Sequence, residues 1–232
     1  MNTDTKYEPP LLWPAYGSTV LRAPKKTPIR VDPDKVELTG PVFGQDTVGP
    51  LDHDLTQGLG GEPLGERIIV HGRVTDGDGR PVPHSLIEIW QTNAAGRYSH
   101  DRDQHPAPLD PHFNGVGRCL TDGDGNYRFV TIRPGAYPWR NHHNAWRPAH
   151  IHFSLFGRAF VQRLITQMYF PGDPLLPLDP ILASIPEQGR PLLVAEFDLN
   201  ETVPQWALAY RWDIILRSTP TQKPVEKPME DQ

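Results

Sequence analysis

The fold is decided by residues 66–92, which read ERIIVHGRVTDGDGRPVPHSLIEIWQT. Apolar and polar residues alternate in ERIIVHGRV and again in HSLIEIWQT, and a period of two is typical of half-buried β-strands. The TDGDG between them supplies Asp-Gly pairs, which favour the positive backbone angles of a hairpin turn. The stretch therefore predicts a strand, a tight turn and a second strand.

The same pattern continues towards the C-terminus. TDGDG occurs again in TDGDGNYRFVTI, residues 121–132, and apolar residues alternate with charged ones over residues 193–199 and 208–214. These segments predict further half-buried antiparallel strands. No long window has the apolar spacing of a helix, so any helix should be short and lie in the 50s or the 180s. We expect an all-β protein, a two-sheet antiparallel β-sandwich with long loops and an extended N-terminal arm.

The two ends of the chain differ from this central part in composition. Residues 1–50 are too rich in proline for regular structure, yet EPPLLWPAYG carries large apolar side chains, so we predict an ordered arm that packs on a partner or on the chain's own core. Residues 219–232 are charged and broken by proline, which predicts a disordered tail. Residues 51–218 are left as one β-sandwich domain, which would carry any catalytic site.

Composition excludes some classes of function. The 232-residue chain has a formal net charge of -5, so it lacks the basic field that nucleic-acid binding requires. The single cysteine, Cys119, and the lack of a signal-peptide pattern in MNTDTKYEPP indicate a cytoplasmic protein. No apolar segment approaches the roughly twenty residues that cross a bilayer, so we expect no membrane contact. The expected partner is a small molecule or another protein chain.

Residues 137–153, YPWRNHHNAWRPAHIHF, concentrate aromatic side chains, arginine and histidine. His150 and His152 are two apart on a predicted strand, so both imidazoles project from the same face and could hold one metal ion. A lone pair of this kind could equally face solvent on an edge strand. Tyr137 favours the metal site, because a phenol is a poor ligand for zinc or copper(I) but a good one for a hard trivalent ion. The residues alone therefore suggest iron(III).

Four long runs carry a resemblance to a known family: GERIIVHGRVTDGDGRPVPHSLIEIWQTNAAGRYSH, LDPHFNGVGRCLTDGDGNYRF, RPGAYPWRN and WRPAHIHFSL. Together they resemble the intradiol ring-cleaving dioxygenases, and the likeness extends from PAYGSTVLRAPKK to AYRWDIILR. The resemblance implies non-haem iron(III) in a β-sandwich, held by two histidines, two tyrosines and a hydroxide. It also implies insertion of both atoms of O2 into a catechol such as protocatechuate, which gives a cis,cis-muconate in the β-ketoadipate pathway of aromatic catabolism. A related alpha chain would complete the pocket in a hetero-oligomer, and a homo-oligomer is the alternative.

The resemblance can be carried over to single positions. His150, His152 and Tyr137 match three of the metal ligands. Arg147 matches a residue beside the substrate ring, where a guanidinium would stabilise negative charge. The remaining matches are Gln167, counted as catalytic together with Arg147 and Tyr137, and the substrate-binding residues Trp139, Tyr16 and Arg22. Structural alternatives stay open, since Arg147 could pair with a carboxylate, Trp139 could belong to the core, and Gln167 could cap a strand.

The fourth metal ligand departs from the family pattern. A second tyrosine should stand a few residues before the LDPxF segment, and in SHDRDQHPAPLDPHF we assign that position to His105. Replacing a phenolate by a neutral imidazole would leave the ferric site with a net charge of about +1 before substrate binds, so iron(II) would be easier to reach. We expect His105 as the fourth ligand. The alternatives are Tyr98 or His100 after a local shift, or an open site.

Other interpretations follow from this departure. The chain could be a variant or degenerate family member that acts weakly or on another catechol. A transthyretin-like binding module would explain the TDGDG turns but not YPWRN or WRPAHIH. His142 and His143 lie between Tyr137 and the paired histidines, and we expect them to face solvent rather than iron.

Overall fold

The structure is a computed structural model that describes residues 5–27, 29, 48–139, 146–156, 163–216 and 219–220. Its helical elements are η1 (Thr5–Tyr7), α1 (Gly17–Arg22), η4 (Leu176–Leu178), α2 (Pro180–Ser184) and η5 (Glu187–Leu193). Its strands are β1 (Arg67–Thr75), β2 (Leu86–Trp90), β3 (Val116–Leu120), β4 (Asn126–Ile132), β5 (Tyr137–Pro138), β6 (Trp146–Arg147), β7 (His150–Phe156), β8 (Arg163–Tyr169), β9 (Glu196–Val203), β10 (Ala207–Arg211) and β11 (Ile214–Ile215).

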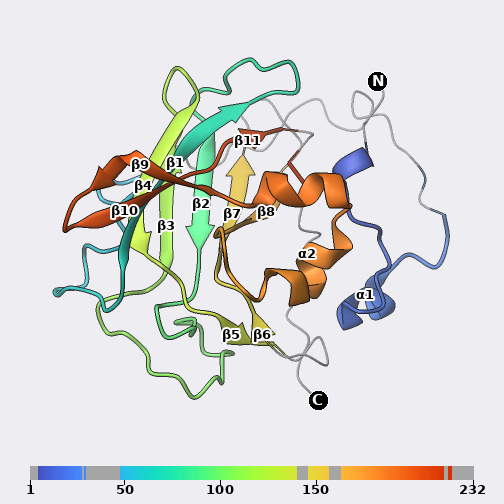
Figure 1. Cartoon of the computed structure of the whole chain (residues 1–232), viewed down its shortest axis with the longest axis horizontal. Helices are drawn as coiled ribbons and strands as arrows, with labels where there is room; N and C mark the ends of the chain where they lie inside the picture. Colours follow the sequence, from blue (N-terminus) through green and yellow to red (C-terminus); the bar gives the residue numbers. More distant parts are fainter. Residues whose placement is uncertain are drawn as a thin grey trace.

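The strands form two main sheets and a short ribbon (Figure 1). In sheet I, β1 pairs antiparallel with β4 and parallel with β10 and β11, and β9 lies at the far edge. Sheet II is antiparallel throughout, in the order β3-β2-β7-β8, while β5 and β6 pair only with each other. The predicted all-β, two-sheet architecture is confirmed, but sheet I is mixed and not antiparallel throughout as predicted, because strand periodicity does not indicate the direction of the neighbouring strand.

The two TDGDG segments form the predicted tight turns but connect the two sheets. In each turn the N–H of the first aspartate donates to the carbonyl four residues on, from Asp76 to Arg80 and from Asp122 to Asn126, both at 2.8 Å. The last glycine of each turn has a positive φ, +82° and +80°, as a turn of this kind requires. β1 and β4 lie in sheet I, whereas β2 and β3 lie in sheet II. Alternation indicates which face of a strand is buried, and it says nothing about which strand lies beside it.

The main core lies between the two sheets. Ile68 and Val70 of β1 and Phe129 of β4 face Ile151 and Phe153 of β7, and all five side chains are fully buried in one cluster. Burial of each such side chain stabilises the fold by about 1.5–3 kcal/mol. Because successive residues of a strand point to opposite faces, the alternate residues of each sheet form an outer face.

The segment that follows the arm bridges the two sheets at one side. The N–H of Arg118 on β3 donates to the carbonyl of Asp52 (2.8 Å), and the N–H of Val130 on β4 donates to that of His53 (2.8 Å). The N–H of Leu55 completes the bridge by donating to the carbonyl of Val130 (2.9 Å). The helix predicted as an alternative for the 50s does not form in this segment, because its backbone groups pair with the strand edges instead.

Short helices accompany the arm side of the sandwich. The helix predicted for the 180s is present as α2, and Figure 1 shows the arm on the same side of the sheets as α2. The arm contains α1, although we expected no regular structure there. The stretch between Pro14 and Pro24 is free of proline, which leaves room for these few helical residues. The Thr19 hydroxyl accepts from the N–H of Trp13 (2.9 Å), which ties the helix to the chain before it.

β9 is more exposed than its alternation predicts. Leu193 and Ala195, just before the strand, are buried, but Phe197 and Leu199 are 49% and 73% exposed. β9 is the edge of sheet I, and its register against β10 shifts between Ala207 and the next paired residue. The prediction of a half-buried strand is therefore wrong for β9, since an edge strand with a bulge leaves these side chains largely in solvent, and the described ring contact of Phe197 is an edge contact with Tyr210 at 5.9 Å.

Several predictions fall on residues outside the described ranges. These include His142 and His143 and residues 221–232, which form most of the predicted tail. The first two residues of that tail, Thr219 and Pro220, are buried. Among the described residues, no helix has the length and apolar character needed to cross a membrane.

Candidate metal centre

His150 and His152 project from the outer face of sheet II. They alternate along β7 with core residues such as Ile151, so the strand period places both imidazoles on one side, with ring centroids 4.9 Å apart. His150 Nδ1 donates to the carbonyl of Pro148 (2.7 Å), which leaves Nε2 with the lone pair. Burial, followed by the charge of Arg147, holds the pKa of His150 well below its ordinary value. The imidazole is therefore neutral and able to bind a metal ion.

Two tyrosines lie against these histidines. The ring of Tyr137 on β5 is 5.4 Å from that of His150. Tyr98, in the loop between β2 and β3, has its hydroxyl 3.0 Å from His152 Nε2 and its ring 5.4 Å from that of Tyr137. Burial and then the neighbouring Tyr137 hold the pKa of Tyr98 well above its ordinary value, so this phenol ionises only beside a strong cation. No group of three or more His, Cys, Asp or Glu side chains in the described part of the chain could hold a metal, so this mixed His and Tyr set is the candidate.

A close backbone contact brings Tyr98 to this position. The turn after β2 packs on the segment before β5, and a Cβ on Gly96 would stand 2.0 Å from the carbonyl oxygen of Ala136. A Cβ on Gly135 would stand 2.5 Å from the carbonyl oxygen of Ala94. Only glycine allows this approach, and Gly96 also has a φ of +79°. The two glycines therefore carry Tyr98 next to the tyrosine of β5.

His105, the predicted fourth ligand, has other contacts than the two histidines and two tyrosines of this cluster. Its ring packs on Trp146, with centroids 6.1 Å apart, and its Nδ1 is buried without a hydrogen-bond partner. The carboxylate of Asp103 accepts from the N–H groups of both Tyr98 (2.8 Å) and His105 (2.9 Å), so the loop turns between them. Of the described contacts, none joins His105 to the two imidazoles or to the phenol of β5. His100, the other alternative, is exposed.

Arg147 is the hub of a buried polar network. It faces Tyr137 across the β5–β6 ribbon, and its Nη1 donates to the Tyr137 hydroxyl (3.3 Å) and lies 3.0 Å from His150 Nε2. Nη2 donates to Gln167 Oε1 (2.8 Å). The alternative of a carboxylate partner is also realised, because Nη2 is 2.8 Å from Asp179 Oδ2 and the two side chains are 2% and 0% exposed. Burial opposes the charge of Arg147, but Asp179 and the phenols outweigh it and hold the pKa well above its ordinary value.

Sheet register aligns the remaining site residues. Trp90 on β2 and Gln167 on β8 are the cross-strand neighbours of His152, and Tyr169 is the neighbour of His150. The Trp90 ring stacks on His152 at 4.8 Å with an interplanar angle of 5°. Gln167 Nε2 lies 3.2 Å from His152 Nδ1. Trp90 and Tyr169 were not predicted, because the sequence shows the face of a residue but not its neighbour on the next strand.

The arm reaches the site through Trp139. The buried Tyr16 ring makes an edge contact with Trp139 at 5.1 Å, and the guanidinium of Arg147 lies over Trp139 at 5.4 Å. Arg22 in turn lies over Tyr16 at 4.8 Å. The Tyr16 hydroxyl is buried without a hydrogen-bond partner. The structure thus brings four residues predicted from the sequence into one continuous stack that runs from the arm to the metal centre.

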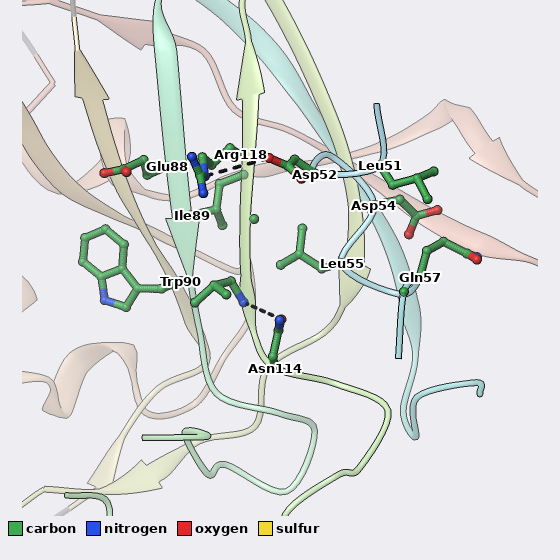
Figure 2. Close-up of a pocket in the computed structure, with 13 residues that line it drawn as sticks. Leu51, Asp52, Asp54, Leu55, Gln57, Glu88, Ile89, Trp90, Asn114 and Arg118 are labelled. Atoms are coloured by element: carbon green, nitrogen blue, oxygen red, sulfur yellow. Dashed lines mark hydrogen bonds and ion pairs between the residues drawn. The ribbon is translucent and has the colours of Figure 1, made fainter. Parts of the chain in front are cut away.

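A groove of about 700 Å³ lies elsewhere, between β3 and the segment around residues 51–58 (Figure 2). Asp52 and Arg118 contribute to its lining, and Trp90 is the one residue of the cluster described above that also lines it. Figure 2 shows the Trp90 side chain pointing away from the 51–58 segment. The groove is therefore separate from the metal centre, in spite of its size.

Comparison with known proteins identifies the family. Residues 38–218 match the family described as Dioxygenase, and residues 7–34 match the family described as Protocatechuate 3,4-dioxygenase beta subunit N terminal. The chain therefore belongs to the intradiol ring-cleaving dioxygenases. This membership favours an enzyme over the transthyretin-like binding module.

Individual relatives show which members of the family the chain is similar to. The chain is 54% identical over 225 residues to the protocatechuate 3,4-dioxygenase beta chain of Burkholderia cepacia, which covers 95% of this chain and 96% of that one. It is 31% identical over 153 residues to the alpha chain from the same organism, with 65% and 72% covered. Among solved structures, catechol 1,2-dioxygenase from Acinetobacter sp. ADP1 has a TM-score of 0.54 at 27% identity and covers 75% of this chain and 60% of its own. Within its family the chain is thus similar to protocatechuate 3,4-dioxygenase beta chains.

Proposed function

We propose that the chain is a non-haem iron(III) dioxygenase subunit that cleaves protocatechuate (3,4-dihydroxybenzoate) to 3-carboxy-cis,cis-muconate in the β-ketoadipate pathway. The proposed metal ligands are Tyr98, Tyr137, His150 and His152. The observation that carries the proposal is the convergence of two phenols and two imidazoles on the outer face of sheet II in a member of this family.

The donor set fits a ferric ion. The Tyr98 hydroxyl and His152 Nε2, two metal-binding atoms from distant segments, lie 3.0 Å apart, and the backbone fixes the tautomer of His150. Two phenolates and a hydroxide would offset the charge of iron(III), so the excess positive charge expected for a histidine at the fourth position does not arise. When bound, the ferric ion supplies Lewis acidity and a redox-active centre for the reaction with O2. In this proposal Tyr98 takes the place that we first assigned to His105.

The protein groups around the metal have distinct roles. Arg147 places a buried positive charge beside the phenol of Tyr137, where it would stabilise negative charge that develops on the catechol ring. Tyr98 lies on a loop and Tyr137 on the short β5–β6 ribbon, so the two phenols come from different segments. Either phenolate would be a base beside the catechol, able to accept one of its protons at the phenol oxygen. Gln167 connects Arg147 to His152 and holds both side chains in place.

The arm would recognise the ring substituent. The Tyr16 hydroxyl is a buried donor without a partner, and the guanidinium of Arg22 lies over the ring of Tyr16. A carboxylate on the catechol ring could accept from the Tyr16 hydroxyl and would be attracted by the charge of Arg22. Trp139 separates these residues from Arg147 and would form a wall of the substrate pocket.

A related alpha chain is the proposed partner. The arm exposes large apolar side chains, which is typical of a surface that another chain covers: Leu11, Leu12, Val20, Leu21 and Ile29. The chain is similar to both a beta chain and an alpha chain of one enzyme, which supports a hetero-oligomer of two related subunits. The free, buried Cys119 is compatible with the cytoplasm as its compartment.

The test is the iron content and visible spectrum of the protein, purified alone and with a co-expressed alpha chain. We expect near-stoichiometric iron, a phenolate-to-iron band, and a shift of that band on anaerobic addition of protocatechuate. Admission of O2 should then consume one O2 per protocatechuate and yield 3-carboxy-cis,cis-muconate. Protein without iron, or iron-loaded protein whose visible band does not change on addition of protocatechuate, would contradict the proposal.

A further inference from the structure

A buried carboxylate, Asp179, lies directly behind Arg147. Its two oxygens face one edge of the guanidinium, with Arg147 Nε 3.3 Å from Oδ1 and Nη2 2.8 Å from Oδ2. Neither side chain reaches solvent to a significant extent. Because an arginine in such a place is held by its partners, the orientation of the guanidinium depends on this carboxylate.

Asp179 is itself fixed by the start of α2. It is the N-cap residue, its Oδ1 accepts from the N–H of Ile181 (3.1 Å), and Pro180 occupies the first helical position. The Tyr169 hydroxyl donates to Oδ2 (2.8 Å), and burial raises the pKa of Tyr169 so that it keeps its proton. The sequence Asp-Pro before a short apolar run indicates a helix start, but it does not reveal an arginine partner far away in the chain.

The opposite edge of the guanidinium faces the metal centre. Asp179 and Gln167 engage Nε and Nη2, and Nη1 points to the Tyr137 hydroxyl (3.3 Å) and to His150 Nε2 (3.0 Å). The donors of arginine lie in one rigid plane, so fixing one edge fixes the direction of the other.

We propose that Asp179 is a positioning residue that orients Arg147 towards the metal centre from the first turn of α2. This inference rests on the proposed function, since it assumes that Arg147 acts on the reacting ring. It gives the start of α2 a role in catalysis that acts through Arg147.

The test compares Asp179→Asn with Asp173→Asn. Asparagine is as good an N-cap as aspartate and has the same size, so Asp179→Asn removes the charge but keeps the helix start. Asp173 is a matched control in the same connection: its carboxylate accepts from the N–H groups of Ala149 (3.0 Å) and Leu175 (2.9 Å), and none of its described contacts is to Arg147.

Three readouts distinguish positioning from a purely structural role. In the iron-loaded holoenzyme we expect Asp179→Asn to lower kcat about 100-fold with KM changed less than about threefold, because the stabilisation lost is that of charge in the transition state. Asp173→Asn should stay within about threefold of the wild type in both constants. The phenolate-to-iron band should shift in Asp179→Asn, because Arg147 no longer donates to Tyr137, and should be unchanged in Asp173→Asn.

A crystal structure of each variant without metal provides the third readout. We expect Nη1 of Arg147 to have left Tyr137 in Asp179→Asn. Unchanged kcat, an unchanged band, or an unmoved Arg147 in that variant would overturn the inference. If wild-type protein neither binds iron nor cleaves protocatechuate, the proposed function fails, and the crystal structure still decides the positioning role.

A second variant covers the case in which Asp179→Asn does not fold. Tyr169→Phe removes one hydroxyl from Asp179 and Arg147 without changing any charge. It should lower kcat several-fold, with a smaller shift of the band in the same direction. A variant with wild-type kcat and spectrum would overturn the inference.

Discussion

Each sheet of the sandwich presents a histidine on its outer face, and the two faces differ in what covers them. His152 of sheet II is buried beneath Trp90, the Tyr98 loop and the β5–β6 side of the chain. His71 of sheet I lies 3.1 Å from the carboxylate of Asp198 on β9, with both side chains 19% exposed. It borders an open cleft of about 580 Å³ lined largely by charged residues.

The difference shows that a histidine on an outer face is not enough for a candidate metal site, and that the segments packed over it decide. On sheet I the imidazole of His71 is partly solvated and has the carboxylate of Asp198 as its partner, so a metal ion is not needed to satisfy it. On sheet II the two imidazoles are buried and the phenols of Tyr98 and Tyr137 are half-buried. Of the carboxylates described around them, Asp179 is paired with Arg147 and Asp103 accepts from backbone N–H groups. Groups buried in this way need a charge partner, and a trivalent cation can ionise the phenols and supply that charge.

The largest expected effect separates the histidines of the two faces. His150→Ala or His152→Ala should lose most of the iron, because each removes one of four proposed ligands. His71→Ala should keep a wild-type iron content. The measurement is iron per chain in purified protein by elemental analysis. Full occupancy in either sheet II variant, or loss of iron from His71→Ala, would break the comparison.

The phenolate band tests which loop residue completes the set. Tyr98→Phe should weaken and shift the visible band of iron-loaded protein, and Tyr137→Phe should leave a residual band that arises from Tyr98. The double variant should be colourless. His105→Phe serves as the control and should keep the wild-type spectrum, because His105 packs on Trp146. A spectrum that responds to His105→Phe but not to Tyr98→Phe would restore His105 as the ligand.

Stability should distinguish the inner from the outer face. Phe153→Ala removes a fully buried ring from the core and should lower the free energy of unfolding by about 3–5 kcal/mol. Phe197→Ala removes a half-exposed ring from the edge strand and should cost less than about 1 kcal/mol. Urea unfolding of the two variants measures both values. Equal losses would mean that another chain covers β9 in the assembled protein.

A smaller difference is expected for the thiol of Cys119 on the inner face. Burial raises the pKa of Cys119 from 9.0 to about 12. Above pH 9 the unfolded thiol ionises and the folded one does not, so the unfolded state binds fewer protons and stability falls as pH rises, by about 1.4 kcal/mol per pH unit. The comparison is urea unfolding at pH 8 and pH 10. Wild type should lose about 1.4 kcal/mol more than Cys119→Ala between these values, and equal losses would show that the thiol ionises in the folded state.

Local sequence predicted the parts of the molecule that depend on neighbouring residues. Strand alternation located β1, β2, β4 and β10, and the spacing of His150 and His152 placed both imidazoles on one face. Tyr137 joined them because it follows a recognisable Pro-Gly turn. These features are set within a few residues of chain, where backbone geometry leaves few alternatives.

The features that the sequence did not show lie where distant segments meet. The proposal of Tyr98 in place of His105 rests on the contact of Gly96 with the segment before β5, and the loop sequence itself does not reveal this contact. Asp179 meets Arg147 only after the sheet has formed. The exposure of β9 reflects its place at an edge, which is a property of the whole sheet.

The short bridge at residues 52–55 also bears on how the sandwich opens. Its backbone hydrogen bonds hold β3 of one sheet and β4 of the other, so neither strand can detach from this side while the bridge remains in place. The amide protons of Leu55, Arg118 and Val130 should therefore exchange with deuterated solvent together, as one cooperative unit that draws members from both sheets. Residues 52–55 thus link the two sheets, and the loss of their backbone hydrogen bonds would be an early event in unfolding at this edge.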